Sequence, residues 1–277
     1  RDITFGWIDV TSPTSPINTN VDPAMFNAVQ VITRRSPEVN GALKLFFAPI
    51  FGKSSTTVTA SAVASYVGQI TTYDISVPFS ANLWPFTIHE DEFERWMKTS
   101  TDKFGYDSDT DAVNRKPDGQ SEVRIYPDKL APGNYGLLNI GSPNQSTTLL
   151  GQQIINGVSP NDLEIEIGSS DLSFVDSDGN PTGYDISGNS GLKSALQASI
   201  QLRYGDVVAF FVHDRVSGGG SNVSYHVTGL RFARVMFSEL RSSKTRGLWM
   251  QPVAYTGPGI ITKPGSSSNS GKIMLVR

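Results

Sequence analysis

The 277-residue sequence has no cysteine, which excludes disulfide bonds, thiolate catalysis, cysteine-held iron–sulfur clusters and cysteine zinc sites. Histidine is nearly as scarce. His89, His213 and His226 are the only three, and no two of them have the spacing at which helical histidines share a metal ion. A histidine-rich zinc centre is therefore not expected.

An excess of positive charge and a long hydrophobic run are missing as well. The 23 Lys and Arg residues are outnumbered by 26 Asp and Glu residues, so the net charge of −3 offers no footprint for nucleic acid or an anionic membrane. The longest apolar stretch, residues 43–51, is interrupted by Lys44 and is less than half of the ~18–20 residues that a spanning helix needs. Because the sequence begins at Arg1 and not at methionine, we expect a leader or an anchor to precede it in a longer product.

The residues that are present predict a strand-rich protein. With 38% hydrophobic residues, 26 glycines and 16 prolines, the composition is that of a polar, turn-rich globular chain. The predicted fold class is α+β and β-rich, with antiparallel, sandwich-like sheets and two or three short helices. Strands are expected at residues 3–10, 28–33, 56–67, 70–77, 122–126, 135–140, 207–212, 225–237 and 248–255, and helices at residues 89–97, 146–156 and 192–200, the last with Ser190 as its N-cap.

Three parts are expected along the chain. Residues 1–68 form an N-terminal β segment, residues 69–255 a β-rich main domain with short helices, and residues 256–277 a flexible tail with a terminal strand. Gly68 and Gln69 mark the first junction. The tail is predicted from its content of glycine, proline and serine.

The strand expected at residues 56–67 has small side chains on one face. The residues that share this face are Val58, Ala60, Ala62 and Ala64. Another element is able to approach such a face closely, so this strand is a candidate interface.

Carboxylates stand at alternate positions in one polar loop, at Asp107, Asp109 and Asp111. This pattern brings oxygen ligands around a hard cation such as calcium. The loop is not an EF-hand, because Ala112 and Asp118 stand where that motif has glycine and glutamate. A looser calcium loop and a solvated acidic turn both stay open, and calcium is the one cofactor that the sequence suggests.

Other motifs point weakly to chemistry. His213 and Asp214, near the end of an expected strand, form two thirds of a Ser/His/Asp set, but no Gly-x-Ser-x-Gly elbow supplies the nucleophile. A strand-end histidine is the simpler interpretation, and the chain is not predicted to be an enzyme. Residues 176–180, between Val175 and Pro181, are most simply a hairpin-type turn, with calcium as the weaker alternative.

Three groups of segments occur in a recognisable order. The first comprises residues 27–31, 45–52 and 58–64; the second residues 126–128, 130–136, 140–147 and 153–157; the third residues 190–193, 216–222, 225–227 and 251–252. In this order they resemble TadG-like or TadG-related envelope proteins of tight-adherence (Tad) pilus assembly. The similarity covers most of the chain and depends mainly on the first group, with its Phe-Phe-Ala and Ala-Ser-Ala-Val-Ala sequences.

The resemblance implies an exported, extracytoplasmic protein of the cell envelope or surface, normally with one N-terminal membrane helix ahead of the region shown. It implies no catalytic residues. Another TadG-like subgroup has a von Willebrand type A domain, whose Asp-x-Ser-x-Ser metal motif is absent here. We therefore expect a non-enzymatic structural or assembly component of a Tad-type pilus or related surface structure. Its expected partners are itself or other envelope and pilus proteins, with no nucleic acid, and the membrane only through the expected N-terminal helix.

The end of the tail is the second predicted interface. Its residues are Lys272, Ile273, Met274, Leu275 and Val276. They form an apolar strand that one subunit is able to donate to the sheet edge of another, which predicts homo-oligomer or filament assembly.

The alternative function is a calcium-ordered extracellular binding or adhesion module, and a hydrolase ranks below it. Such a module recognises sugars through exposed aromatic rings, for which Trp7, Trp84 and Trp249 are the candidates. Each of these tryptophans is more often a core residue.

Overall fold

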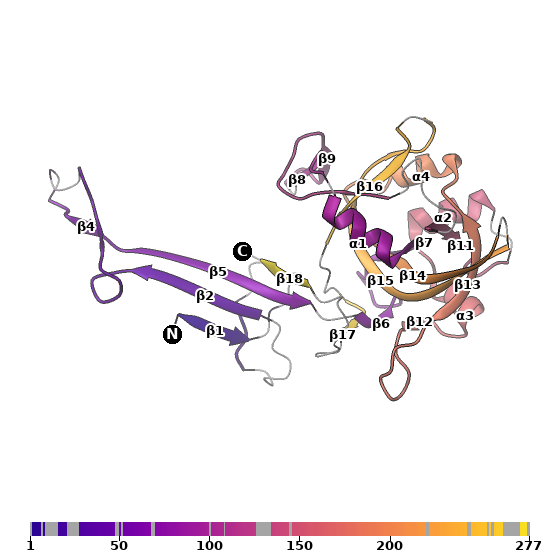
Figure 1. Ribbon diagram of the computed structural model, residues 1–277, viewed down its shortest axis with the longest axis horizontal. Helices are drawn as coiled ribbons and strands as arrows, with labels where there is room; N and C mark the ends of the chain where they lie inside the picture. The colour runs from indigo at the N-terminus through magenta and orange to yellow at the C-terminus, as the bar shows by residue number, and fades with distance from the viewer. Residues whose placement is uncertain are drawn as a thin grey trace. The chain divides into compact units, whose positions relative to one another are not determined.

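The computed structural model describes the chain except for residues 1, 7, 9–15, 21–27, 48–49, 51, 68–69, 100, 108, 126–133, 144–145, 220–221, 243–244, 254, 256–257, 263–271 and 276–277. Two compact units make up the chain: unit 1 comprises Arg1–Gln69 with Thr262–Arg277, and unit 2 comprises Ile70–Ile261. Each unit has its own principal sheet (Figure 1).

Unit 1 is built on a four-stranded antiparallel sheet. Its strands lie in the order β1 (Ile3–Gly6), β2 (Ala28–Arg35), β5 (Val58–Val67) and β18 (Lys272–Leu275). Between β2 and β5 the chain forms a small antiparallel pair, β3 (Leu43–Lys44) with β4 (Ser55–Thr56). Residues 58–64 are in β5, as predicted. Val58, Ala60, Ala62 and Ala64 therefore share one face of the sheet, because successive residues of an extended strand point to opposite faces.

Unit 2 contains a seven-stranded mixed sheet in which five strands close into a ring. The strand order is β10, β16, β15, β13, β11, β7, β14, and β14 pairs with β15 as well as with β7. Among the described strands of this sheet only β7 and β14 run parallel. The strands are β7 (Asn82–His89), β10 (Val123–Ile125), β11 (Tyr135–Leu138), β13 (Tyr184–Ser190), β14 (Val207–Gly219), β15 (Asn222–Glu239) and β16 (Gly247–Pro252).

Smaller sheets and short helices complete unit 2. A three-stranded sheet joins β12 (Asp171–Ser173), β6 (Ile70–Asp74) and β17 (Ile260–Thr262), and a hairpin joins β8 (Gly105–Asp107) to β9 (Ala112–Asn114). The helices are α1 (Glu90–Thr99), α2 (Thr147–Asn156), α3 (Pro160–Ile167), the 3₁₀ turn η3 (Ser194–Leu196) and α4 (Gln197–Gln201). The prediction of a β-rich α+β fold is confirmed.

The core of unit 2 lies on both faces of β14. Val208, Phe210 and Val212 belong to a cluster that includes residues of α1, α2 and α4, whereas Ala209 and Phe211 belong to a second cluster with residues of α3, β6 and β12. All five side chains are buried. A strand covered on both faces is continuously apolar, which is the pattern of residues 207–212.

Two local predictions are wrong. Ser190 is not an N-cap: it ends β13, and the helical segment begins at Ser194 after Lys193, whose side chain makes no capping hydrogen bond. His213 is not at a strand end, because β14 continues to Gly219. Irregular pairing with β15 on both sides of His213 explains why the hydrophobic pattern stops there while the strand does not.

Strand β7 has no counterpart among the predicted elements. Its sequence contains Pro85, which lacks an N–H and argues against a central strand. The structure accommodates the proline at an irregularity. Ala209 pairs with Leu83 and Phe211 with Thr87, so three residues of β7 stand opposite the single residue Phe210.

Candidate functional site

The register of the sheet in unit 1 gathers apolar side chains on one face. Ile3 pairs with Val31 and Val31 with Ala62, while Phe5 pairs with Val29 and Val29 with Ala64. Directly paired residues point to the same side of a sheet. We call this surface the open face and define it by the residues Ile3, Phe5, Val29, Val31, Val58, Ala60, Ala62 and Ala64.

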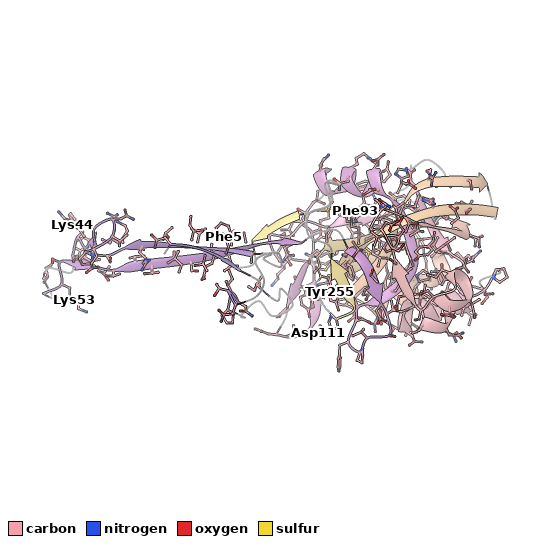
Figure 2. The ribbon with its side chains drawn as sticks, turned by 90° about the horizontal axis from the view of Figure 1, so that it is seen from below. Phe5, Lys44, Lys53, Phe93, Asp111 and Tyr255 are labelled. Atoms are coloured by element: carbon pink, nitrogen blue, oxygen red, sulfur yellow. The ribbon has the colours of Figure 1, made fainter. Side chains whose placement is uncertain are left out.

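The two faces of this sheet differ in burial. On the far side Ala28 and Val63 pack with Ile8 and Ile17, and Val63 is fully buried. On the open face Ile3 is 52% exposed, Phe5 62%, Val31 41% and Val58 44%. Phe5 is labelled in Figure 2. One face therefore has a small core, whereas the other presents apolar side chains to solvent.

The same sheet is only two strands wide over part of its length. Among the described strands, β1 pairs with residues 28–31 of β2, and β18 pairs with residues 64–67 of β5. Beyond these segments β2 and β5 pair only with each other, up to Arg35 and Val58. An isolated two-stranded ribbon is marginally stable in water, and its outer edges carry backbone groups suited to adding a strand.

Polar contacts hold the N-terminal strand to this ribbon. The Nε–H of Arg34 donates to Asp2 Oδ1 at 3.1 Å, and the two side chains form an ion pair. The hydrogen bond and the charge of Arg34 hold the pKa of Asp2 below its ordinary value. On the buried-face side, Gln30 Nε2 donates to Ser61 Oγ at 2.9 Å.

The structure places most of the predicted tail interface inside this sheet. Lys272 pairs with Val67, Ile273 with Tyr66, Met274 with Ser65 and Leu275 with Ala64, all in the same chain. Val276 lies outside the described residues. Donation of this strand to another subunit stays a prediction.

The predicted calcium ligands lie in the hairpin of β8 and β9. Asp107, Asp109 and Asp111 are exposed. Asp107 Oδ1 accepts the N–H of Asp109 at 2.9 Å, and Asp111 Oδ1 accepts the hydroxyl of Tyr106 at 2.7 Å. Hydrogen bonds from the side chain of Thr110 and the backbone of Asp109 hold the pKa of Asp107 below its ordinary value. Calcium at these residues stays a prediction.

A second set of oxygens converges nearby on Gln251, a residue that sequence reasoning missed. Gln251 Nε2 lies 3.2 Å from both carboxylate oxygens of Asp118 and 3.3 Å from Glu122 Oε1 and from the carbonyl oxygens of Phe104 and Gln120. Carboxylate and carbonyl oxygens are also calcium ligands. Within the described ranges, however, no group of three or more His, Cys, Asp or Glu side chains is arranged to hold a metal ion.

One contact each of His213 and His226 can be compared with the Ser/His/Asp arrangement that the sequence suggests only weakly. His213 Nδ1 lies 2.8 Å from Thr87 Oγ1, and both residues are fully buried. His226 Nδ1 lies 2.9 Å from Asp185 Oδ1, but the Asp185 side chain is 76% exposed. Neither contact joins a histidine to a buried Ser and a buried Asp, which is the arrangement that a Ser/His/Asp mechanism needs.

The remaining sequence candidates have structural roles. Trp84 is 1% exposed and Trp249 is 9% exposed, so both are core residues and offer no surface for sugar stacking. Trp7 lies outside the described residues. Residues 176–180 form the predicted turn, in which Asp176 Oδ1 accepts the N–H groups of Asp178 and Asn180.

Comparison with known proteins assigns the N-terminal segment. Residues 1–64 match the family model described as "Putative Tad-like Flp pilus-assembly". Residues 1–64 are therefore similar to a Tad-like pilus-assembly domain, and we refer to them as the Tad-like domain. The predicted resemblance to Tad proteins is thereby confirmed, on a match that covers the first segment of unit 1. No curated protein and no solved structure matches the chain.

The Tad-like domain contains β1, β2 and most of β5, and with them every residue that defines the open face. The match supports a general role in pilus assembly, with a place in the cell envelope and other envelope or pilus proteins as partners. The family description favours a non-enzymatic role. Within the described part of the chain, no helix is both long and apolar enough to cross a membrane.

Proposed function

We propose that this chain is a non-enzymatic, extracytoplasmic structural or assembly component of a Tad-type pilus or a related surface structure. It acts by protein–protein association, including association with further copies of itself. The open face of the Tad-like domain is the observation that carries this proposal. A sheet with one covered face and one apolar, exposed face lacks a partner on the second side.

The association surface has two complementary features. The residues that define the open face are apolar, and along β5 its side chains Ala60, Ala62 and Ala64 are small enough for close approach. Along the two-stranded part of the ribbon, the outer edges of β2 and β5 add backbone groups that pair with no third strand among those described. Two of these groups already have other partners: the N–H of Ile32 donates to the carbonyl oxygen of Asp2, and the carbonyl oxygen of Arg34 accepts from Asn40 Nδ2. A partner therefore gains both apolar burial and backbone hydrogen bonds.

Substitution of the open face tests the proposal. The double variant Phe5→Thr with Val31→Thr places β-branched threonine, which is favoured in strands, at both positions but removes apolar surface. Association measured by light scattering over a concentration series should weaken by at least about tenfold, since each large apolar side chain contributes about 1.5–3 kcal/mol on burial. The variant Phe79→Ser is the matched control, because Phe79 is 94% exposed but belongs to unit 2.

A change of opposite sign sharpens this test. Thr33 is exposed and pairs with Ala60, so its side chain points to the same side as the open face. Thr33→Val should strengthen association by extending the apolar surface. Equal association of wild type, Thr33→Val and the double variant would contradict the proposal.

Strand donation by the tail is the second part of the proposal and has its own experiment. Deletion of residues 263–277 removes β18, keeps β17 and leaves residues 64–67 of β5 without this partner strand. If copies exchange this strand, light scattering will show loss of the assembled species, and an added peptide of residues 271–277 will compete with assembly of the full chain. Unchanged assembly after the deletion would exclude exchange while leaving the open face untouched.

The calcium-ordered binding module is the alternative that the Asp107 loop raises. Calcium that binds the folded chain specifically should raise the melting temperature in a concentration-dependent way. Asp107→Asn with Asp109→Asn should abolish that rise if these carboxylates are ligands, whereas Asp176→Asn is a control in a similar turn. A melting temperature that is independent of calcium would remove the alternative.

A further inference from the structure

The loop that ends the β2–β5 ribbon exposes large apolar side chains. Leu43 is 38% exposed, Phe46 90%, Phe47 73% and Ile50 80%. The rings of Phe46 and Phe47 meet edge to face with 5.0 Å between their centroids. We call this region the tip and define it by the residues Leu43, Lys44, Phe46, Phe47, Ile50 and Lys53. It is separate from the residues of the open face.

Both charged residues of the tip are positive, and the nearest acid before it in the sequence is Glu38. Residues 39–73 contain no Asp or Glu, and their only charged side chains are Lys44 and Lys53. Both lysines are exposed, and Figure 2 shows them at the same end of the ribbon. The net charge of the whole chain is −3, so the tip is a local exception to the acidic balance of the molecule.

Hydrogen bonds at its base hold the tip in place. Leu43 and Lys44 pair with Thr56 and Ser55, and the N–H of Leu45 donates to the carbonyl oxygen of Ser54 at 3.1 Å. These hydrogen bonds join the two arms of the loop within the chain. Gly41 precedes the tip and Gly52 lies within it, and a Cβ atom added at either would meet nothing within 4 Å. The tip therefore projects into solvent.

We propose that the tip inserts into the headgroup region of a lipid bilayer that contains anionic lipids. Phe46, Phe47 and Ile50 enter the boundary between headgroups and acyl chains, where aromatic side chains are favoured, and the two lysines contact lipid phosphates. A bilayer accepts a projecting apolar loop without a matching shape. An anionic bilayer also attracts lysine side chains and repels carboxylates, and this agrees with the absence of acidic residues in residues 39–73.

Vesicle binding by the full chain tests this inference. Co-sedimentation is measured with vesicles of phosphatidylethanolamine and phosphatidylglycerol at 3:1 and with vesicles of phosphatidylcholine alone. We expect binding to the anionic vesicles, weaker binding to phosphatidylcholine, and weakening of the former when ionic strength rises from about 0.1 to about 1 M. The double variant Phe46→Ser with Phe47→Ser should bind at least about tenfold more weakly. Lys44→Gln with Lys53→Gln should bind anionic vesicles about tenfold more weakly and phosphatidylcholine unchanged.

A control variant and a second readout separate insertion from misfolding. Phe79→Ser removes an equally exposed phenylalanine from unit 2 and should bind like wild type. The variant Phe46→Trp adds a tryptophan to the four native ones, whose fluorescence is measured separately in wild type. Lipids brominated along their acyl chains should quench the fluorescence that the variant has in excess of wild type.

Three results would overturn the proposal. They are a wild type that does not bind anionic vesicles, a double phenylalanine variant that binds as wild type does, and bromolipids that leave the fluorescence added by Phe46→Trp unquenched. The first result would indicate that the tip binds a protein and not a bilayer. Because the open-face variants retain the tip, loss of self-association and loss of vesicle binding are distinguishable outcomes.

Discussion

At the scale of single residues, glycine positions inside the closed ring of unit 2 show how strand pairing and side-chain size are matched. The Tyr225 side chain is fully buried, and its hydroxyl donates to the carbonyl oxygen of Tyr135 at 3.1 Å. Burial raises the pKa of Tyr225 to about 12. A Cβ atom at Gly136 would lie 2.3 Å from Tyr225 Cζ, so the aromatic ring of Tyr225 requires a residue without a side chain at position 136.

Gly136→Ala should therefore lower the free energy of unfolding by about 1–3 kcal/mol, because a buried aromatic ring has no room to move aside. Chemical denaturation measures this change. Gly229→Ala is the control: its nearest neighbour, Val212 Cγ2, would lie at an ordinary 3.4 Å, and its effect should be small. Similar effects of the two substitutions would contradict the packing argument.

A second residue-scale prediction concerns Glu122. The residue is 1% exposed, and its carboxylate accepts the N–H groups of Lys103 at 2.8 Å and Phe104 at 3.2 Å. Burial outweighs these hydrogen bonds and raises the pKa of Glu122 above its ordinary value of 4.5. The folded state then holds the proton more tightly than the unfolded state, so this group destabilises the fold as pH rises through the interval between the two pKa values.

The difference in unfolding free energy between wild type and Glu122→Gln should consequently change with pH. Wild type should lose stability relative to the variant as pH rises from about 4 to about 7, since only wild type must ionise the buried group. Denaturation series at several pH values provide the measurement. A difference that is constant over this range, or that grows in favour of wild type, would show that the pKa of Glu122 is not raised.

At the scale of elements, helix ends explain which helices local sequence predicts. Helix α2 is predicted from its apolar pattern, and Ser146 is its N-cap, with Oγ accepting the N–H of Leu149. Helix α3 is not predicted, although its end has a complete capping box. Ser159 Oγ accepts the N–H of Asp162, Asp162 Oδ2 accepts the N–H of Ser159, and Pro160 stands in the first turn. Its acidic and apolar residues alternate, which hides the helical period.

Ser159→Ala should lower the free energy of unfolding by about 1 kcal/mol, because it leaves an N–H at the helix start without its acceptor. The control is Glu164→Ala, an exposed position of the same helix whose replacement should change stability by less than about 0.5 kcal/mol. Thermal unfolding of both variants decides the comparison. Equal effects would mean that the capping box adds no stability to α3.

At the scale of the whole molecule, the hydrophobic core is divided unequally between the two units. The two large buried clusters contain only residues of unit 2, whereas the buried cluster described in unit 1 consists of Ile8, Ala28 and Val63. The small size of the buried cluster among the described residues of unit 1 agrees with the exposed open face and with the partner proposed for it. The division of the chain into separately folding domains stays a prediction.

A fragment of residues 70–262, which keeps the whole of β17, should fold alone and unfold in one cooperative transition. A fragment of residues 1–69, the longer segment of unit 1, should unfold at a lower temperature or without cooperativity. Circular dichroism melts of both fragments and the full chain provide the measurement. Loss of cooperative unfolding in residues 70–262 would show that unit 2 needs contacts from unit 1.

Local sequence was sufficient for those properties that depend on neighbouring residues. Alternation at Val58, Ala60, Ala62 and Ala64 predicts β5 and its small-residue face, and the apolar positions of residues 146–156 predict α2, because strand and helix periods are properties of a short window. The Tad resemblance also came from contiguous residues. Only the tertiary structure showed that Ile3 and Phe5 join Val29 and Val31 on one face, that this face is open while Val63 is buried, and that Phe46 and Phe47 project beside two lysines. Pairing register and burial are set by contacts between distant segments. The alternation of residues along one strand therefore does not show which of two similar sheet faces is buried by other residues.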